Sequence, residues 1–206
     1  PQLAAAPEVF HTAWGALEPA LGIEAGQSLL IRGGSSAAGL VAADYAKTKG
    51  LTVLSTTRDA AKSDRLREFG ADHVVIETGE IAAQVRDIVS DGVDAMFDLV
   101  GTKVIEDSFA CIRRGGILCM AGLLGGEWVI PEFAPGAVIP STTKFTYFSS
   151  SSTPMPTDAL QAYLDGLADG TYRMPLDRVF RFDQIQEAHA CMEANAAIGK
   201  IVVSVV

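Results

Sequence analysis

The chain has 206 residues, of which 49% are hydrophobic and 20% charged, and its formal net charge is −9. This length suffices for one large packed domain or a domain with an appendage. The acidic balance argues against nucleic acid or an anionic membrane as a partner, because both require clustered Lys and Arg. The most apolar stretch, residues 115–126, contains glycine and is shorter than the roughly 20 apolar residues of a membrane span.

The amino terminus and the cysteines bear on the cellular compartment. The opening residues, PQLAAAPEVF, lack a cationic flank before an apolar core, so no signal peptide is expected. Cys111, Cys119 and Cys191 form an odd, scattered set without a CxxC pair. This usage fits reduced thiols better than a disulfide framework, and it predicts a cytoplasmic protein.

Short β-branched runs alternate with longer amphipathic runs along most of the chain. A first helix is expected at residues 8–18, with Pro7 in its first turn and Pro19 as its stop. Buried strands are expected at residues 28–32, 51–56, 73–76, 93–100, 116–122 and 144–149. Helices with glycine just beyond each are expected at residues 37–49, 60–69, 81–90 and 103–114. This alternation predicts an α/β Rossmann fold, a doubly wound parallel sheet.

The carboxyl-terminal part does not continue the alternation. It consists of an expected helix at 157–170, a strand at 178–182, a helix at 183–195 and a final strand at 200–206. The fold class is therefore a doubly wound sheet followed by an α+β tail.

The most informative segment is LLIRGGSSAAG, residues 29–39, where glycines separate the first strand of the sheet from its helix. In such a turn, backbone N–H groups and the helix N-terminus can approach a pyrophosphate. The spacing differs from GxGxxG, since Ser36 or Ala37 replaces the middle glycine. A tight turn without a ligand is the alternative to a dinucleotide site. The expected cofactor-binding residues are Gly33, Gly34, Ser35, Ser36, Ala37, Ala38 and Gly39.

The end of the second strand predicts which dinucleotide is bound. NAD sites carry Asp or Glu about 20 residues beyond the glycines. This chain has Thr56, Thr57 and Arg58 there, with Lys62 one helical turn later. A 2′-phosphate suits a guanidinium, hydroxyls and a cation, so NADP(H) is expected rather than NAD. Asp59 is acidic but stands at the N-cap position of the next helix. The alternative is that Arg58 and Lys62 are only solvated charges.

Five segments carry a family resemblance when they are taken in this order and spacing. They are AAAPEVFHTAWGAL (4–17), IRGGSSAAGLVAADYAK (31–47), LREFGADHVVI (66–76), FDLVGTKVIEDSFACIRRGGILCMAGLLGG (97–126) and IQEAHACMEANAAIGKIVVSV (185–205). Together they resemble the zinc-free, zeta-crystallin-like quinone oxidoreductases of the medium-chain dehydrogenase/reductase superfamily. The loop of that family is closer to GASGGVG, so Ser36 and Ala37 replace two of its glycines.

The resemblance implies three parts. Residues 1–20 would be a connecting helix, residues 21–155 the NADP-binding Rossmann domain, and residues 156–206 the carboxyl-terminal segment of a GroES-like catalytic domain. Members of the family carry most of that substrate domain in front of the first part. The chain by itself is therefore expected to be inactive.

The resemblance also implies NADPH-dependent hydride transfer to a small-molecule electron acceptor, a quinone or another activated carbonyl or alkene. The cofactor carries this chemistry, and the protein positions it. The Thr12 hydroxyl would lie near the nicotinamide, and Phe148 would belong to the cofactor site. Val100-Gly101 and Gly122-Leu123 follow the fourth and fifth strands, whose carboxyl ends line the crevice. The alternatives are a non-catalytic NADP-binding module and a zinc-type alcohol dehydrogenase or enoyl reductase relative.

Two other chemistries require different residues. Catalytic zinc needs convergent Cys, His or Glu ligands, but His11, His73 and His189 are far apart, so no metal is expected. Glu8 stands where zinc-using relatives place a Cys ligand. A serine hydrolase would need GxSxG around Ser35, from which the loop departs by one residue.

Residues 142–150 form the sixth expected strand and should lie at an edge of the sheet. Exposed edges pair readily unless charge, proline or a bulge prevents it, and this strand carries only Lys144. Members of the family pair this edge across a two-fold axis, so a homodimer is expected. The alternative is an edge covered by the chain's own last residues, 199–206.

Overall fold

A six-stranded parallel sheet forms the centre of the molecule, and the computed structural model describes residues 1–205. The strand order is β3-β2-β1-β4-β5-β6. The strands are β1 (Ser28–Arg32), β2 (Thr52–Thr57), β3 (His73–Ile76), β4 (Val93–Asp98), β5 (Ile112–Met120) and β6 (Lys144–Tyr147). The predicted doubly wound Rossmann fold is confirmed. The chain reverses direction across the sheet between β1 and β4, where such folds bind their ligands.

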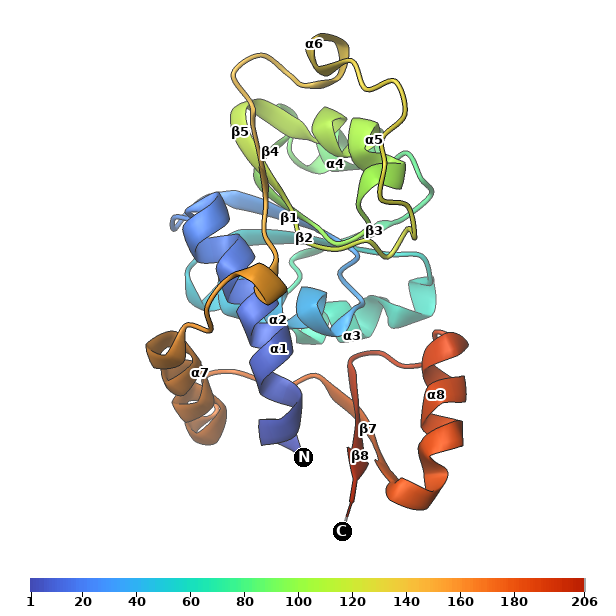
Figure 1. Ribbon diagram of the computed structural model, residues 1–206. Helices are drawn as coiled ribbons and strands as arrows, with labels where there is room; N and C mark the ends of the chain where they lie inside the picture. Colours follow the sequence, from blue (N-terminus) through green and yellow to red (C-terminus); the bar gives the residue numbers. More distant parts are fainter. Residues whose placement is uncertain (206) are drawn as a thin grey trace.

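Helices cover both faces of this sheet (Figure 1). Leu29 and Ile31 of β1 pack into the layer that contains α1 and α2, whereas Leu30 packs into the layer that contains α4 and α5. Because both faces are covered, β1 is a continuous apolar run rather than an alternating one. The helices are α1 (Gln2–Gly15), α2 (Ala37–Thr48), α3 (Ser63–Glu68), α4 (Ala82–Ile88), α5 (Ile105–Ala110) and the short α6 (Pro135–Val138).

The amino-terminal helix is longer than predicted. α1 begins at Gln2, and a π-helical turn, Ala16–Leu21, continues it without a break, so Pro7 and Pro19 lie inside helical backbone. Ala5, Val9 and Ala13 of α1 are buried in the same core as α2. Tertiary burial of this face outweighs the local stop signal of the prolines.

The predicted helix at 103–114 is wrong at its carboxyl end. α5 ends at Ala110, and Ile112 already pairs with Val93 at the start of β5. The register between β4 and β5 shifts after this pair, which gives room for the Gly115-Gly116 dipeptide. Strand pairing with β4 therefore decided a boundary that local helix periodicity placed four residues later.

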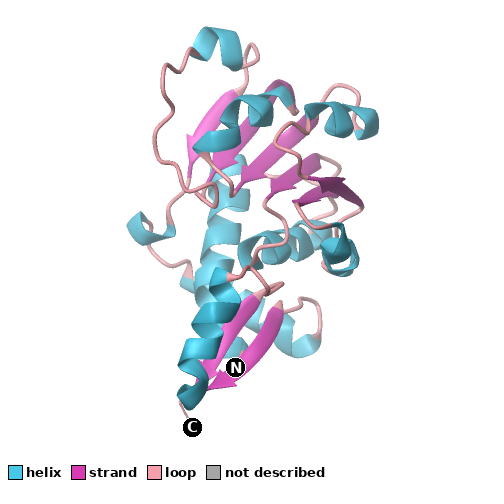
Figure 2. Ribbon diagram, turned by 90° about the vertical axis from the view of Figure 1, so that its right-hand side faces the viewer, coloured by secondary structure: helices cyan, strands magenta, loops and turns pink. Residues whose placement is uncertain are grey.

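The carboxyl-terminal part contains α7 (Thr157–Asp169), β7 (Leu176–Arg181), α8 (Ile185–Glu193) and β8 (Lys200–Ser204). β7 and β8 form a separate two-stranded parallel sheet, which projects from the Rossmann sheet together with α8 (Figures 1 and 2). We call β7, α8 and β8 the tail unit. α7 instead packs on α1, where the Tyr163 ring stacks on Phe10 with 4.4 Å between centroids. The division at residues 155 and 156 stays a prediction.

Within residues 1–205, no helix is both long enough and apolar enough to cross a lipid bilayer.

Candidate functional site

A cavity of about 730 Å³ opens at the carboxyl ends of the sheet strands. This volume falls within the roughly 300–1,000 Å³ typical of small-molecule sites. Its walls come from the segments that follow β1 to β5 and from the turn between α8 and β8. The lining residues are Gly33, Ser35, Ser36, Ala37, Thr56, Thr57, Arg58, Glu77, Thr78, Gly79, Val100, Lys103, Val104, Leu124, Gly125, Met192, Asn195, Ala197 and Gly199.

The glycine loop after β1 leaves no room for larger side chains at two positions. A Cβ on Gly34 would overlap Ser55 Oγ of β2. A Cβ on Gly39 would come within 2.7 Å of Gly33 O and Gly34 Cα, so α2 can pack closely against the loop only with glycine there. These are the two roles expected of glycines in a dinucleotide-binding turn, a close backbone approach and close helix–strand packing.

Ser36 replaces a glycine of the family loop without strain. Its backbone is extended, with φ −74° and ψ 161°, and its hydroxyl accepts the Gly39 N–H at 3.1 Å. The same hydroxyl donates to Gly33 O at 2.8 Å. Ser36 is therefore the N-cap of α2, and Ala37 opens a helix whose first N–H groups have no partner within the helix. The helix N-terminus at the cavity wall favours an anion.

At the end of β2, three side chains make hydrogen bonds within the protein, and one arginine faces the cavity. The Thr56 hydroxyl accepts the Gly33 N–H at 3.0 Å, which joins β2 to the glycine loop. Thr57 bonds to the backbone of Asp59, and Asp59 caps the following 3₁₀ turn through the Ala61 N–H, as predicted. Arg58 is exposed on the cavity wall. Within residues 1–205, its guanidinium makes no hydrogen bond or ion pair.

Lys62 lies away from the cavity. It is only 8% exposed, and its Nζ donates to Asn195 O at 3.2 Å and, more weakly, to Ala197 O at 3.5 Å. Both acceptors belong to the turn between α8 and β8. Lys62 thus contacts the turn that forms one cavity wall and does not itself line the cavity.

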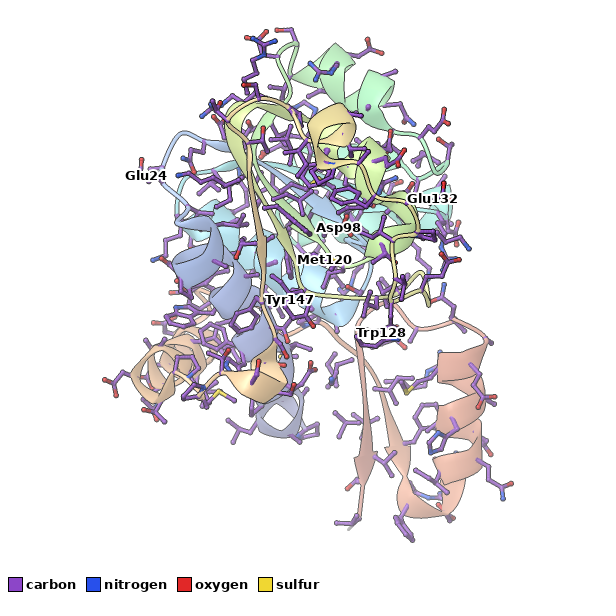
Figure 3. The ribbon with its side chains drawn as sticks, turned by 45° about the horizontal axis from the view of Figure 1, so that its top comes forward. Glu24, Asp98, Met120, Trp128, Glu132 and Tyr147 are labelled. Carbon is purple, nitrogen blue, oxygen red and sulfur yellow. The ribbon has the colours of Figure 1, made fainter. Side chains whose placement is uncertain are left out.

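The turn after β4 is organised by a buried carboxylate. Asp98 Oδ1 accepts the N–H groups of Val100 and Gly101 at 2.8 and 2.9 Å, so this carboxylate has a structural role in the turn. A Cβ on Gly101 would lie 2.7 Å from Gly122 O, which shows how closely the loops after β4 and β5 pack. Figure 3 shows Asp98 and Met120 in the body of the molecule, where they are register partners of β4 and β5.

Thr12 and Phe148 are predicted residues that lie on or against α1, outside this cavity. Thr12 is buried on α1, and its hydroxyl donates to Glu8 Oε1 at 3.4 Å. The Phe148 ring packs on Gly15 of α1 and lies edge-on to His11, with 5.7 Å between ring centroids. Of the other predicted residues, Gly34, Ala38, Gly39, Gly101, Gly122 and Leu123 support the loops without lining the cavity.

Several lining residues were not among the sequence-based candidates. Glu77, Thr78 and Gly79 directly follow β3, and the rule that ligands bind at the carboxyl ends of parallel strands could have indicated them. No local signal points to Asn195 or its neighbours in the tail unit, because only the fold brings them to the cavity.

Reactive side chains and metal donors are scarce in the part of the chain that the structure describes. Within residues 1–205, no three His, Cys, Asp or Glu side chains are grouped to hold a metal ion. Cys111 and Cys119 are buried, and burial raises the pKa of both thiols to about 12. Both thiols are therefore protonated at neutral pH and unsuited to nucleophilic chemistry.

Comparison with known proteins places this site in a family context. A family model described as zinc-binding dehydrogenase matches residues 69–203. The chain is 23% identical over 186 residues to the 2-haloacrylate reductase of Burkholderia sp, covering 87% of this chain and 56% of that protein. It is 23% identical over 205 residues to the "Probable quinone oxidoreductase" of Schizosaccharomyces pombe, covering 92% of this chain and 58% of that protein. The chain thus spans somewhat more than half the length of these relatives.

Solved structures share the fold. A mycobacterial protein complexed with NADPH superposes with a TM-score of 0.84 at 22% sequence identity, covering 98% of this chain and 63% of that one. At this level of identity, the likeness establishes the arrangement of helices and strands.

Proposed function

The chain belongs to the zinc-binding dehydrogenase family, within the medium-chain dehydrogenase/reductase superfamily, and from this premise we propose that it is the NADPH-binding part of an oxidoreductase. One observation carries the choice of cofactor. Arg58 stands on the cavity wall without an ion-pair partner among residues 1–205, directly after Thr56 and Thr57. A guanidinium in this position suits a 2′-phosphate, which NADPH has and NADH lacks.

Different residues of the cavity would bind different parts of the cofactor. The N-terminus of α2 and the glycine loop would receive the pyrophosphate, because N–H groups and the helix dipole favour anions there. Arg58 would pair with the 2′-phosphate, while Val100 and the turn organised by Asp98 would form the opposite wall. When bound, NADPH supplies the hydride that reduces the acceptor.

The proposed acceptor is a quinone or another activated carbonyl or alkene. Relatives named 2-haloacrylate reductase and quinone oxidoreductase support this class. In this proposal, Thr12 and Phe148 lie on the nicotinamide side, beyond the cavity described above. Zinc does not fit this part of the chain, since residues 1–205 group no suitable donor side chains.

The cofactor proposal is tested by titrating the purified protein with NADPH and NADH. Arg58→Asp should weaken NADPH binding about tenfold or more, because a charge-assisted contact is lost. NADH binding should weaken less, because the new carboxylate can accept a ribose hydroxyl. Arg67→Asp is the matched control, since Arg67 pairs with Asp64 on α3 and does not line the cavity. Equal affinity of the parent protein for NADH and NADPH would contradict the assignment.

The competing function is an NADPH-binding module without turnover. Oxidation of NADPH by 1,4-quinones, followed at 340 nm in the protein with its substrate domain, separates the two. Turnover supports the reductase. Tight NADPH binding without turnover across several quinones and activated alkenes supports the module.

The homodimer is part of the proposal, and β6 is its contact. β6 is the last strand of the sheet, and within residues 1–205 β8 pairs with β7 rather than with this edge. The Phe148 N–H donates to Met120 O and therefore points toward β5. Neighbouring N–H groups of a strand point to opposite sides, so the Tyr147 N–H points away from β5, toward the open edge. Tyr147→Pro should therefore yield monomers, whereas Tyr147→Ala keeps the edge donor. A parent protein that sediments as a monomer at high micromolar concentration would contradict the dimer.

We further propose a cytoplasmic location. The three cysteines are free thiols, and Cys111 and Cys119 are fully buried on the Rossmann side of the molecule. Such thiols suit a reducing compartment.

A further inference from the structure

The sheet contains a buried charge that the proposed function does not yet use. Arg32 is the last residue of β1, and its side chain is 0% exposed. Its partners Glu77, Gly79 and Val104 line the cavity, so the guanidinium lies directly behind the cavity wall. A buried guanidinium is costly unless every N–H is paired, so the choice of its partners is informative.

All five N–H donors of Arg32 have acceptors. Nε and Nη2 donate to the two carboxylate oxygens of Glu77, each at 2.8 Å, and Nη2 also donates to Gly79 O at 3.0 Å. Nη1 donates to Ser108 Oγ at 2.9 Å and to Val104 O at 3.2 Å. Asp107 Oδ2 lies 2.9 Å from the same nitrogen. Arg32 thus joins the segment after β3 to the segment after β4 through hydrogen bonds.

Glu77 is the member of this network that reaches the cavity. It lines the same wall as Arg58, and its carboxylate is the acidic group on that wall. Burial alone would raise the pKa of Glu77, but hydrogen bonds and charge attraction from Arg32 hold it below the usual range. The Arg58 charge on the same wall also lowers this pKa, by less than Arg32 does. Glu77 is therefore ionised at neutral pH.

The geometry decides which arginine this carboxylate pairs with. Both Glu77 oxygens accept from the Arg32 fork, and Oε1 also accepts the Gly79 N–H at 2.9 Å. A bidentate pair from behind the wall neutralises the carboxylate and fixes its orientation. Arg58 makes no ion pair with it. Without Arg32, Arg58 would be an exposed cation on the same cavity wall, and its charge already acts on Glu77.

We propose that Arg32 is a positioning residue that sets cofactor selectivity: by holding Glu77 from behind, it leaves Arg58 free for the 2′-phosphate of NADPH. This inference rests on the proposed function. Removing Arg32 would let Glu77 capture Arg58 and would add an unpaired negative charge beside the phosphate. Both effects act on NADPH more than on NADH, which has no 2′-phosphate.

Titration of four proteins with NADPH and NADH tests the inference. They are the parent, Arg32→Met, Glu77→Gln and the double variant Arg32→Met/Glu77→Gln. Arg32→Met should weaken NADPH binding about tenfold more than NADH binding, as expected for one lost charge-assisted contact. The double variant should regain most of the preference for NADPH, because the competing carboxylate is gone. An equal loss of affinity for both cofactors in Arg32→Met would overturn the inference.

Two further measurements separate positioning from structural support. In an Arg58→Ala background, Arg32→Met should change the NADPH-to-NADH affinity ratio less than it does in the parent, because only the added negative charge remains, and an equal change would contradict the mechanism. Arg173→Met is the matched control. Arg173 Nη2 lies 2.8 Å from Oδ1 of the buried Asp44, and neither residue lines the cavity. The control variant should lower the melting temperature without changing the ratio.

The outcomes remain distinct from those of the proposed function. If Arg32→Met does not fold, Arg32→Lys provides the test, since lysine keeps the charge but cannot hold both Glu77 oxygens. It should give a smaller loss of selectivity. A parent protein without a preference for NADPH would overturn both proposals. A parent with that preference and an Arg32→Lys ratio equal to it would overturn only this inference.

Discussion

The molecule contains two parallel sheets built from the same β–α–β unit, and they differ in what covers them. All five residues of β1 are buried, whereas Phe180 is the one buried residue of β7. Helices lie on both faces of the six-stranded sheet, whereas the two-stranded sheet packs with α8 and reaches α1 through Lys200 and Glu8 (Figures 1 and 2). Parallel strands are normally buried on both faces, and a two-stranded sheet is marginal alone. The comparison shows that the tail unit depends on its surroundings more than the Rossmann sheet does.

Few contacts attach the tail unit to the rest of the chain. Lys62 bonds to carbonyls of the turn between α8 and β8, and Lys200 Nζ lies 2.8 Å from Glu8 Oε2 of α1. Ile198 packs against the small core cluster beside α3. These contacts place Asn195 and Gly199 in the cavity wall, so the less buried region still contributes to the candidate site.

The largest contrast between the two regions is expected from aromatic truncation. Phe97→Ala in β4 removes a fully buried ring and should cost about 3–5 kcal/mol of unfolding free energy. Phe182→Ala removes a ring that is 65% exposed beside β7 and should change stability by less than about 0.5 kcal/mol. Urea unfolding measures both. Equal losses would mean that the tail unit is as tightly packed as the Rossmann core.

A smaller effect is expected from a single methyl group in the glycine loop. Gly34→Ala would force its Cβ against Ser55 and should cost about 1–3 kcal/mol, as overpacking does. NADPH binding should weaken with it, because the loop must shift. Gly136→Ala is the control, since nothing lies within 4 Å of the added Cβ. Thermal melts and NADPH titration of both variants check this, and an unchanged Gly34→Ala protein would refute the close approach.

The Lys62→Met variant tests how much Lys62 contributes to the attachment of the tail unit. Losing a hydrogen bond from this buried ammonium should cost about 1 kcal/mol. The amides of residues 195–199 should exchange hydrogen faster, while those of β1 stay protected. Lys49→Met, which removes an exposed pair with Glu18, is the control. Unchanged exchange in the turn would show that the other contacts of the tail unit, such as the Lys200–Glu8 pair and the packing of Leu176 and Val202, are enough to hold it.

The smallest expected effect is the acid response of a half-exposed ion pair. Burial would raise the pKa of Asp72, but hydrogen bonds from Lys47 and the Val53 N–H lower it below 3.8. Its contribution is therefore present above about pH 4 and lost as the pH falls through the lowered value. Asp72→Asn should cost less than about 1 kcal/mol at pH 7 and progressively less toward pH 3. Asp183→Asn, next to β7, should show a weaker pH dependence, because the Asp183 side chain is 65% exposed.

Much of the Rossmann half could be predicted from the sequence, because its signals are local. The strands at 28–32 and 73–76 have the predicted bounds, and Asp59 has the predicted role of helix cap. Apolar runs, caps and tight turns each depend on residues a few positions apart. The glycine loop was also recognisable, although only the structure shows that Ser36 replaces glycine as a helix cap.

Contacts between distant residues were decided by the tertiary structure alone. Lys62 bonds to Asn195 of the turn in the tail unit, 133 positions away, and Arg32 bonds to Glu77 across 45 positions. Local periodicity carries no information about such pairs, because they form only when the sheet order brings strand ends together. The sequence by itself determined that a dinucleotide-type loop follows β1. Only the fold decided which charges stand beside it, since burial and pairing of a side chain depend on every element packed around it.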